Sequence, residues 1–358
     1  MRPVLVRDLA LERWPSMDRY ADALTARVPD AVVPDVWSMA GPRYLTRYWR
    51  YPRALRRWRG DLVHVLDHSY AHCLAAFPGL PSVVTVHDLL PLRVIAGDGD
   101  GLRGLVRNAI LRRVIRWMRR ADRMIVSTRW AADEVERGLG IPAERIHVIP
   151  YGVDQRFSVP PPPSAVEARR AAWLQAGGTD ERTVILIHVG SCAPRKNVEA
   201  AIGALATLRS EGRPTILVQL GGVFAAAQRG LARQLGVADH LIQESSVSED
   251  ALIAAYRAAD ILLVPSEFEG FGLPAVEAMA AGLPVVTSGA GGLREAVGDA
   301  AIVTGALAAD AFADAVIGLL ADGARRAELV ARGRERAAAL TWDRTAASTR
   351  NVYEQLLG

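Results

Sequence analysis

The stretch TVILIHVGSCAPRKN, Thr183–Asn197, joins an apolar run to a polar loop that opens at a glycine. The apolar part, Thr183–Val189, is rich in β-branched side chains and is typical of a buried strand. Gly190 allows the backbone to approach a ligand closely, and the alanine-rich residues after Asn197 favour a helix. The stretch therefore predicts a strand, a loop and a helix in succession, which is the repeating unit of a parallel sheet.

The same alternation extends in both directions along the chain. Towards the C-terminus, strands are predicted at Thr215–Leu220, Asp260–Val264 and Pro284–Thr287, with alanine-rich helices between them. This alternation predicts doubly wound α/β domains that bind ligands at the carboxyl ends of their strands. Towards the N-terminus, the pattern predicts strands Val4–Val6, Ala31–Val36, Leu62–Leu66, Ser82–Val86 and Arg123–Ser127, and helices around Tyr20–Arg27, Leu105–Arg120 and Trp130–Leu139.

Four consecutive prolines, Pro160–Pro163, indicate a boundary between two domains. Such a run cannot continue a helix or a sheet, and 358 residues are about twice the length of a typical domain. Ser164 and Glu167 then have the spacing of a capping box that opens a helix through about Gln175. We therefore expect a first domain over residues 1–163 and a second over residues 164–340.

The basic residues exclude several classes of protein. Of the 43 lysines and arginines only Lys196 is a lysine, and because Asn197 follows it, the chain lacks the motif of P-loop nucleotide hydrolases. It also lacks the protein-kinase pattern, whose lysine lies on a strand. Residues 1–165 hold 25 basic and 17 acidic side chains (net +8), whereas residues 166–358 hold 18 and 22 (net −4). The two halves are thus expected to face different partners.

Hydropathy and cysteine content favour a cytoplasmic location. No uncharged apolar run reaches the ~18 residues that a membrane span needs. Charged residues interrupt Met1–Trp14, unlike the apolar core of a secretory signal. Cys73 and Cys192, the only two cysteines, resemble neither a ligand pair nor a disulfide framework.

The loop after the strand Thr183–Val189 is a candidate phosphate site. Arg195 and Lys196 are expected at the start of a helix, where backbone N–H groups already favour an anion. Asn197 is a candidate N-cap for that helix. A lysine supplies a compact positive charge and an arginine supplies a planar fork, so the pair suits a diphosphate.

A second glycine-rich loop, Ser266–Pro274, follows the strand Asp260–Val264. Gly270 and Gly272 permit close approach to a ligand, and Pro274 suits the first turn of a helix. Glu277 is expected in that first turn, with its carboxylate directed back towards Glu269. A favourable interaction with the helix dipole, worth ~0.3–1 kcal/mol, would also explain an acid at position 277. It does not explain the second acid, Glu269, at this spacing.

Glu269 and Glu277 form an E-x7-E pattern, and the surrounding stretch resembles the retaining glycosyltransferase family 4. Further motifs match the same family in the same order: Thr85–Leu89 (TVHDL), Pro150–Asp154 (PYGVD), Pro194–Asn197 (PRKN) and Gly291–Gly298 (GGLREAVG). The resemblance implies the GT-B fold, with two Rossmann-like domains whose parallel sheets face a central cleft. It also implies a C-terminal helix, residues 341–358, that crosses back to the first domain.

The resemblance implies that the second domain binds a nucleotide-diphosphate sugar, GDP-mannose or a UDP-sugar, without a metal or another cofactor. Lys196 with Arg195 would stabilise the diphosphate as charge develops on the leaving group. Glu269 would fix the donor sugar, Glu277 would hold the ribose, and His87 would reach the transferred sugar from the first domain. Retention of anomeric configuration is expected. The other implied donor-binding residues are Gly190, Ser191, Val247, Gly270, Phe271, Gly272 and Leu273.

A hydroxyl group is the expected acceptor, on a glycan, a lipid-linked sugar or a small molecule. We expect His68, Tyr70 and Asp88 on the acceptor side, after strands of the first domain. Two departures from the family limit this comparison: Ser191 stands where many members have an arginine, and Trp14–Tyr20 contains no glycine where members commonly have a glycine-rich loop.

Two arginine-rich segments of the first half predict a peripheral contact with the anionic inner face of a membrane. Arg43–Arg59 holds seven arginines and no acid, with tyrosines and tryptophans between them, and Arg107–Arg120 is a second basic amphipathic stretch. Both compositions suit anionic headgroups or a lipid-diphosphate acceptor. The alternative is solvated helix faces above core aromatics.

Several other patterns are weaker. His64, His68 and His72 are spaced by four residues next to Cys73, but the strand Leu62–Leu66 separates His64 from the others, so no zinc site is expected. Asp98–Asp100 (DGD) is more typical of a solvated turn than of a metal site.

Two other functions remain open on the sequence alone. One is a nucleotide-sugar epimerase on a similar scaffold, which would change the donor without an acceptor. The other is a basic protein that binds membranes or nucleic acid. That second function leaves Lys196, Glu269 and Glu277 unexplained, so no nucleic-acid partner is expected.

Overall fold

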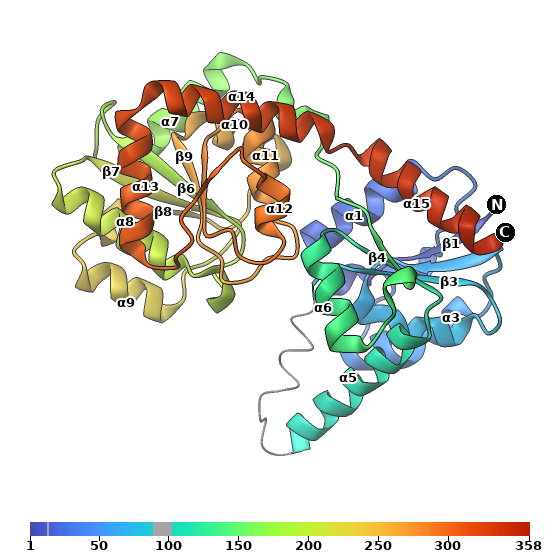
Figure 1. The fold of residues 1–358 in the computed structure, drawn as a ribbon. Coiled ribbons are helices and arrows are strands. Elements are labelled where there is room, and N and C mark those ends of the chain that lie inside the picture. The colour runs from blue at the N-terminus through green and yellow to red at the C-terminus, as the bar shows by residue number, and fades with distance from the viewer. Residues whose placement is uncertain (13, 89–101) are drawn as a thin grey trace. The chain divides into compact units, whose positions relative to one another are not determined.

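The computed structural model describes residues 1–12, 14–88 and 102–358. The chain divides into two units, the first made of Met1–Gly152 and Trp342–Gly358 and the second of Val153–Thr341. Each unit is an α/β domain built on its own parallel sheet (Figure 1). This confirms the predicted fold class.

The first unit contains a five-stranded parallel sheet in the order β1-β2-β3-β4-β5. Its strands are β1 (Pro3–Val6), β2 (Leu62–Val65), β3 (Ser82–Val86), β4 (Arg123–Val126) and β5 (Ile146–Val148). Its described α-helices include α1 (Pro15–Thr25), α3 (Tyr51–Leu55), α5 (Leu102–Arg120), α6 (Arg129–Leu139) and α15 (Trp342–Leu357). The other helical segments are η1 (Ala10–Glu12), η2 (Asp35–Ser38), α2 (Arg43–Leu45), the π-helix η3 (Thr46–Arg50), the 3₁₀ helix η4 (His68–Ala76) and η5 (Ala143–Arg145).

The predicted strand Ala31–Val36 is wrong in its extent. Only Val32 pairs with the sheet, through a single parallel bridge to Val4, and the chain then enters η2. Pro34 explains the difference, because proline has no N–H to donate to a ladder of hydrogen bonds.

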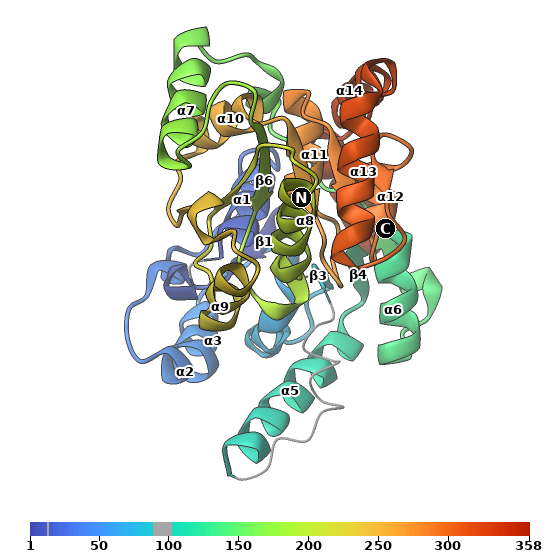
Figure 2. The same ribbon diagram turned by 90° about the vertical axis from the view of Figure 1, so that its left-hand side faces the viewer.

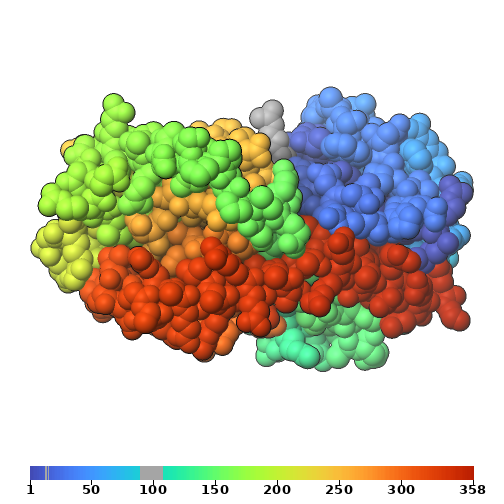
Figure 3. Space-filling view, turned by 90° about the horizontal axis from the view of Figure 1, so that it is seen from above, coloured from blue at the N-terminus to red at the C-terminus, as the bar shows by residue number. Residues whose placement is uncertain are grey.

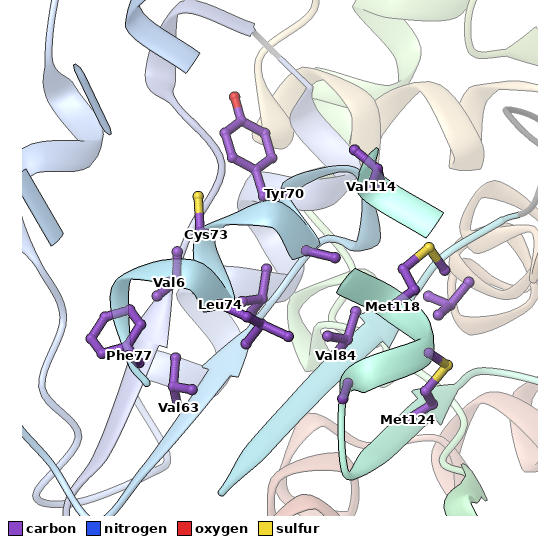
Figure 4. Close-up of a cluster of buried hydrophobic side chains, with 14 of the residues drawn as sticks. Val6, Val63, Tyr70, Cys73, Leu74, Phe77, Val84, Val114, Met118 and Met124 are labelled. Carbon is purple, nitrogen blue, oxygen red and sulfur yellow. The ribbon is translucent and has the colours of Figure 1, made fainter. Parts of the chain in front are cut away.

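Successive side chains of β2 point to opposite faces of the first sheet, and both faces are packed. Val63 and Val65 point into a core that η4, α3, α5 and α6 cover, where Tyr70, Val114 and Met118 also lie (Figure 4). His64, between these valines, points to the opposite face, where its ring contacts Tyr353 of α15. The sheet is therefore covered on both faces, as in a doubly wound domain.

The second unit contains a six-stranded parallel sheet in the order β11-β10-β9-β6-β7-β8. Its strands are β6 (Val184–Val189), β7 (Thr215–Leu220), β8 (Leu241–Glu244), β9 (Ile261–Val264), β10 (Val285–Thr287) and β11 (Ile302–Val303). Its helices are α7 (Pro163–Ala176), α8 (Val198–Ser210), α9 (Ala226–Gln234), α10 (Glu249–Ala258), α11 (Leu273–Ala281), α12 (Leu293–Val297), α13 (Ala309–Ala321) and α14 (Gly323–Ala339), with 3₁₀ turns η6 (Gln155–Ser158), η7 (Pro194–Lys196) and η8 (Ala238–His240).

Helices cover both faces of this second sheet. Helices α8 and α13 lie side by side (Figure 2), and their buried side chains form one apolar cluster with residues of β6, β7 and β9. On the opposite face, α10 packs against α7 and α11. Because β6 and β9 are neighbours at the centre of the sheet, the loops that follow them emerge side by side.

The boundary between the units differs from the predicted one at Pro163. The units divide at Gly152, because Phe157 is already buried against Tyr256 of the second unit. The predicted capping box is also wrong: α7 begins at Pro163 after Pro162, without a side-chain cap, so Ser164 is already helical. Proline at the first helical position needs no N–H partner, which explains the earlier start.

The C-terminal helix α15 belongs to the first unit. Thr345 donates a hydrogen bond of 2.8 Å to the carbonyl of Pro150, and the rings of Tyr20 and Trp342 are in contact. Figure 3 shows this red C-terminal segment packed against the blue N-terminal part of the same unit. The helix thereby completes the face of the first sheet on which His64 lies.

Candidate active site

The site of the second unit is built by the loops that follow β6 and β9. After β6, Gly190 adopts a φ of +132°, which an L side chain rarely adopts, and the chain then forms the short turn η7. After β9, Ser266–Gly272 leads into α11. The candidate phosphate loop and the candidate sugar loop thus start from adjacent strands.

Backbone and side-chain contacts join the two loops. The backbone N–H of Glu267 donates to the carbonyl of Arg195 at 2.8 Å, and the Arg195 guanidinium donates to the carbonyl of Phe268 at 3.3 Å. The Lys196 ammonium forms an ion pair with Oε1 of Glu269. The structure therefore brings together the only lysine of the chain and the first acid of the E-x7-E pattern.

The Glu269 carboxylate is buried and kept ionised by its neighbours. Burial alone would raise its pKa, but the charge and hydrogen bond of Lys196, the charge of Arg195 and the hydrogen bond of Ser266 together lower the pKa below its usual value. Ser266 Oγ lies 2.9 Å from Oε1, and Arg195 Nη1 lies 3.7 Å from Oε2. Two cations, Lys196 and Arg195, therefore lie beside the one carboxylate of Glu269.

Two buried polar side chains, Gln219 and His188, hold the backbone at Gly190. Gln219 donates to the Gly190 carbonyl at 2.7 Å and also contacts His188 Nδ1 at 2.7 Å. Burial, followed by the charge of Lys196, lowers the pKa of His188 to about 4, so its ring is neutral. Sequence reasoning missed both residues, although a histidine within an otherwise apolar strand was a visible signal.

Glycines of a third loop fix the backbone of Glu269. Gly291 has a φ of +63°, and a Cβ atom there would lie 2.4 Å from the Glu269 carbonyl oxygen. Gly292 donates its N–H to that same carbonyl at 2.9 Å. The GGLREAVG motif therefore positions the loop that carries Glu269.

The remaining predicted donor residues lie around these loops. Gly270, Phe271, Gly272 and Leu273 are buried at the start of α11, Ser191 is exposed, and Val247 is half-buried between β8 and α10. Glu277 lies in the second turn of α11 rather than the first, because the helix begins at Leu273. Its Oε2 accepts a hydrogen bond of 3.0 Å from the Tyr256 hydroxyl.

Asn197 does not cap a helix through its side chain. It adopts a left-handed backbone conformation at the start of α8 with a φ of +48°, and its side-chain amide donates to the carbonyl of Leu307 at 3.0 Å. Asn197 is thus the N-cap residue of α8, as predicted, but its side chain makes no capping hydrogen bond, and asparagine instead supplies a conformation that most residues avoid.

In the first unit, His87 directly follows β3 and is buried in a hydrogen-bonded network. Its Nε2 lies 2.7 Å from the Leu66 carbonyl, and its Nδ1 is bonded to the Tyr151 hydroxyl. Because a carbonyl only accepts, Nε2 carries the proton and Nδ1 accepts from Tyr151. Burial lowers the pKa of His87, so the imidazole is neutral.

The three residues predicted on the acceptor side have different environments. Tyr70 is fully buried, and its hydroxyl accepts from the Leu9 N–H and donates to Glu12, so it lies in the core rather than at a surface that an acceptor reaches. Asp88 is half-buried after β3. His68 is buried at the first position of η4.

No zinc site is formed in the part of the chain that the structure describes, where no group of three metal-binding side chains occurs. His64 contacts Tyr353 and Thr85, whereas His72 contacts the carbonyl of Arg47. The predicted turn Asp98–Asp100 lies outside the described residues. The glycine-free segment Trp14–Tyr20 forms the start of α1.

The first arginine-rich segment is helical and partly inserted into the core. Tyr51 is fully buried and Arg47 is buried, whereas Tyr44, Leu45 and Trp49 are 69%, 51% and 57% exposed. The segment therefore combines buried core residues with exposed aromatic and apolar side chains, and the membrane contact stays a prediction. Among the described helices, none has the length and apolar character of a membrane span.

Two family models together match most of the chain. The model described as Glycosyltransferase Family 4 matches residues 10–157, and that described as Glycosyl transferases group 1 matches residues 169–336. The boundary between the two matches lies close to the boundary between the two units.

Curated relatives and solved structures agree with these models. The D-inositol 3-phosphate glycosyltransferase of Xylanimonas cellulosilytica is 38% identical over 66% of this chain and 57% of its own length. The enzyme of that name from Actinosynnema mirum is 36% identical over 77% of this chain and 67% of its own length. The chain thus spans little more than half of the first of these relatives.

Among solved structures, Anabaena HepE in complex with UDP-glucose is similar with a TM-score of 0.78 and 17% identity, covering 99% of this chain and 100% of HepE. At that identity the likeness shows the fold alone. The chain belongs to glycosyltransferase family 4, and its two parallel-sheet α/β domains are those of the GT-B fold.

Proposed function

We propose that the chain transfers a sugar, with retention of configuration and without a metal, from a nucleotide-diphosphate sugar to a hydroxyl acceptor. The donor is GDP-mannose or a UDP-sugar, and the product belongs to polysaccharide, glycolipid or glycosylated-metabolite synthesis. The names of the curated relatives support the class of reaction, and the UDP-glucose bound to HepE supports a nucleotide-sugar donor.

The observation that carries this proposal is the buried pair of Lys196 and Glu269. In a chain that otherwise uses arginine, the lysine lies in a loop with a net positive charge at the carboxyl end of β6. We assign its ammonium, together with Arg195, to the donor diphosphate. As the bond to the sugar breaks, negative charge grows on the leaving phosphate, and positioned cations stabilise that charge without reorganisation.

We assign the sugar to Glu269 and the start of α11. Oε1 of Glu269 is engaged by Lys196 and Ser266, whereas Oε2 lies 3.7 Å from Arg195, which is too far for a hydrogen bond. Oε2 is therefore the oxygen that would accept a donor-sugar hydroxyl. Glu277, which Tyr256 orients, would hold the ribose, and backbone amides of Phe271–Leu273 would contact phosphate or sugar.

We assign His87 to the transferred sugar through its position at the carboxyl end of β3. Its ring is neutral and both of its nitrogens are already hydrogen-bonded, so one of these bonds would open for the ring to hydrogen-bond the sugar. Tyr151 then acts as a positioning residue, because its hydroxyl holds the ring in the orientation whose tautomer the Leu66 carbonyl fixes.

We also propose that the first unit binds an anionic membrane surface peripherally. The exposed side chains of Tyr44, Leu45 and Trp49 lie among the arginines of Arg43–Arg59, and α5 adds a second basic stretch. Such aromatic and basic surfaces bind anionic headgroups. Flotation with anionic vesicles tests this: salt-sensitive binding is expected, and its absence would remove the membrane proposal.

Turnover of Lys196→Ala with UDP- and GDP-sugars tests the central assignment. We expect kcat/KM to fall by at least tenfold, or about 1.4 kcal/mol, with Lys196→Arg retaining more activity than Lys196→Ala. The control is Arg182→Ala, which removes an exposed cation of the same unit. If the Lys196→Ala value stays within tenfold of wild type, the assignment is wrong.

A further inference from the structure

Two buried glutamine side chains hold the loop that follows β6 from one side. Gln219 of β7 donates from Nε2 to the carbonyl of Gly190 at 2.7 Å. Gln228 of α9 donates from Nε2 to the carbonyl of Cys192 at 3.1 Å. Helix α9 lies beside α8, the helix that follows this loop (Figure 2). A strand and a helix thus engage alternate carbonyls of one loop.

The orientation of each glutamine amide is fixed by its other partners. Gln219 Nε2 also donates to the carbonyl of Leu220 at 3.2 Å. Gln228 Oε1 accepts the N–H of Ala225 at 2.8 Å, and Gln228 Nε2 donates to the Glu199 carboxylate at 3.1 Å. Because carbonyl and carboxylate oxygens only accept, the NH₂ group of each amide faces the loop. Both glutamines are buried, so these bonds are shielded from water.

The two held carbonyls determine where the next N–H groups point. A trans peptide group carries its N–H opposite its C=O, and the described residues contain no cis peptide bond. The N–H of Ser191 therefore points away from the glutamine that holds the Gly190 carbonyl. The N–H of Ala193 likewise points away from the glutamine that holds the Cys192 carbonyl. Within the described part of the chain, neither N–H has a hydrogen-bond acceptor.

The Lys196 ammonium lies beside the same loop. A Cβ atom at Gly190 would be only 3.7 Å from Lys196 Nζ. Ser191 is exposed and Ala193 is half-buried, so solvent reaches this part of the loop. A backbone N–H carries a partial positive charge and acts together with a nearby cation on the same anion. The loop therefore offers two oriented N–H groups and one ammonium to a phosphate.

Gly222 allows the loop after β7 to pack against the loop after β6. A Cβ atom at Gly222 would lie 2.6 Å from the Gly190 carbonyl oxygen and 2.9 Å from the Cys192 nitrogen. Both distances are too short for real contacts, so any larger residue would displace the held carbonyls. The position of the loop thus depends on Gly222 as well as on the two glutamines.

We propose that Gln219 and Gln228 are positioning residues for the donor, which direct the N–H groups of Ser191 and Ala193 to oxygens of its diphosphate. This inference rests on the proposed function, because it concerns the donor of the same reaction. The two glutamines themselves do not touch the donor. Their effect is confined to the diphosphate, because the N–H groups that they orient are hydrogen-bond donors suited to anionic oxygens.

Calorimetry of the full chain with UDP and GDP tests this inference. Whichever of the two binds more tightly is the probe, and its nucleoside is the second ligand. Gln228→Met keeps the length of the side chain but removes its amide, and should weaken diphosphate binding at least fivefold while nucleoside binding stays within twofold. The matched control is Gln234→Met, the same change at an exposed position of α9, which should stay within twofold for both ligands. A general loss of structure would instead weaken both ligands alike.

Two further variants test the same loop. Gln219→Met removes the bond to the other carbonyl and is judged by the same criterion. Gly222→Ala removes no side-chain hydrogen bond but displaces the loop, so it should also weaken diphosphate binding at least fivefold and leave the nucleoside unchanged. Its control is Gly230→Ala on α9, where a Cβ atom meets nothing within 4 Å. If a glutamine variant does not fold, Gly222→Ala decides the outcome.

Diphosphate binding that Gln228→Met and Gly222→Ala leave unchanged would overturn the inference, as would equal weakening of diphosphate and nucleoside. Binding by Lys196→Ala separates this outcome from failure of the proposed function. If diphosphate binding depends on Lys196 but not on the glutamines, only the positioning role falls. If it depends on the glutamines but not on Lys196, the proposed role of Lys196 falls and the positioning role stands.

Discussion

Replacing Tyr353 by phenylalanine removes one hydroxyl group from the interior of the first unit. Tyr353 is fully buried on α15, and its hydroxyl lies 2.5 Å from His64 Nδ1. The other ring nitrogen of His64 lies 2.7 Å from the Thr85 hydroxyl, which lies 2.9 Å from that of Tyr20. The variant would therefore interrupt a buried chain of hydrogen bonds that connects α15, β2, β3 and α1.

The expected loss of stability comes from the hydrogen bond alone. The ring volume is retained, so no large cavity forms, but His64 keeps a buried ring nitrogen without a partner. Leaving such a group unsatisfied costs about 1–3 kcal/mol. Burial lowers the pKa of His64 to about 3, so the ring does not protonate at neutral pH to compensate. We expect the free energy of unfolding of the first unit to fall by about 1–3 kcal/mol.

Denaturant unfolding followed by tryptophan fluorescence measures this change. Seven of the eight tryptophans belong to the first unit by sequence, and Trp173 alone belongs to the second, so the signal reports mainly the first unit. Tyr44→Phe is the matched control, because Tyr44 is 69% exposed and should change stability by less than about 0.5 kcal/mol. A change below about 0.5 kcal/mol for Tyr353→Phe would refute the packing of α15 described above.

Two further predictions concern the donor loop and acid stability. Gly291→Ala should weaken UDP-sugar binding at least tenfold, because the new Cβ atom would lie 2.4 Å from the Glu269 carbonyl oxygen. The control is Gly305→Ala, which has a similar φ of +67° but open space around it and should not weaken binding. Equal effects of the two variants would contradict the steric argument. Three buried histidines have their pKa lowered by burial to between about 3 and about 4, so the unfolded chain binds protons below pH 6.5 that the folded chain does not. The free energy of unfolding should therefore be highest above pH 7 and should fall as the pH drops through 6.5, by about 2 kcal/mol per histidine at pH 5. A denaturation midpoint that is unchanged between pH 7.5 and pH 5 would contradict this prediction. The histidines are His64, His72 and His188.

The regular parts of the fold could be predicted from sequence because they depend on local patterns. The apolar runs of β6 and β7 and the periodicity of α6 gave the right element types, with ends displaced by a residue or so. The failures occurred where a single residue decides the outcome. Pro34 ended a predicted strand, and Pro163 began a helix before the predicted cap.

The candidate site could be predicted only in part. The pairing of Lys196 with the loop of Glu269 follows from adjacent strands, since carboxyl ends of parallel strands meet at one edge of a sheet. The support of Gly190 by His188 and Gln219 depends on side chains from two strands whose register the sequence does not reveal. The burial of Tyr70 was missed for the same reason, because its partners come from distant segments.

A crystal structure of the chain with a bound UDP- or GDP-sugar tests the central claim most directly. The account predicts the diphosphate within hydrogen-bonding distance, about 3 Å, of Lys196 Nζ, with the donor sugar against the Glu269 carboxylate. A nucleotide sugar bound at another site, with the Lys196–Glu269 ion pair still closed and out of its reach, would contradict the account.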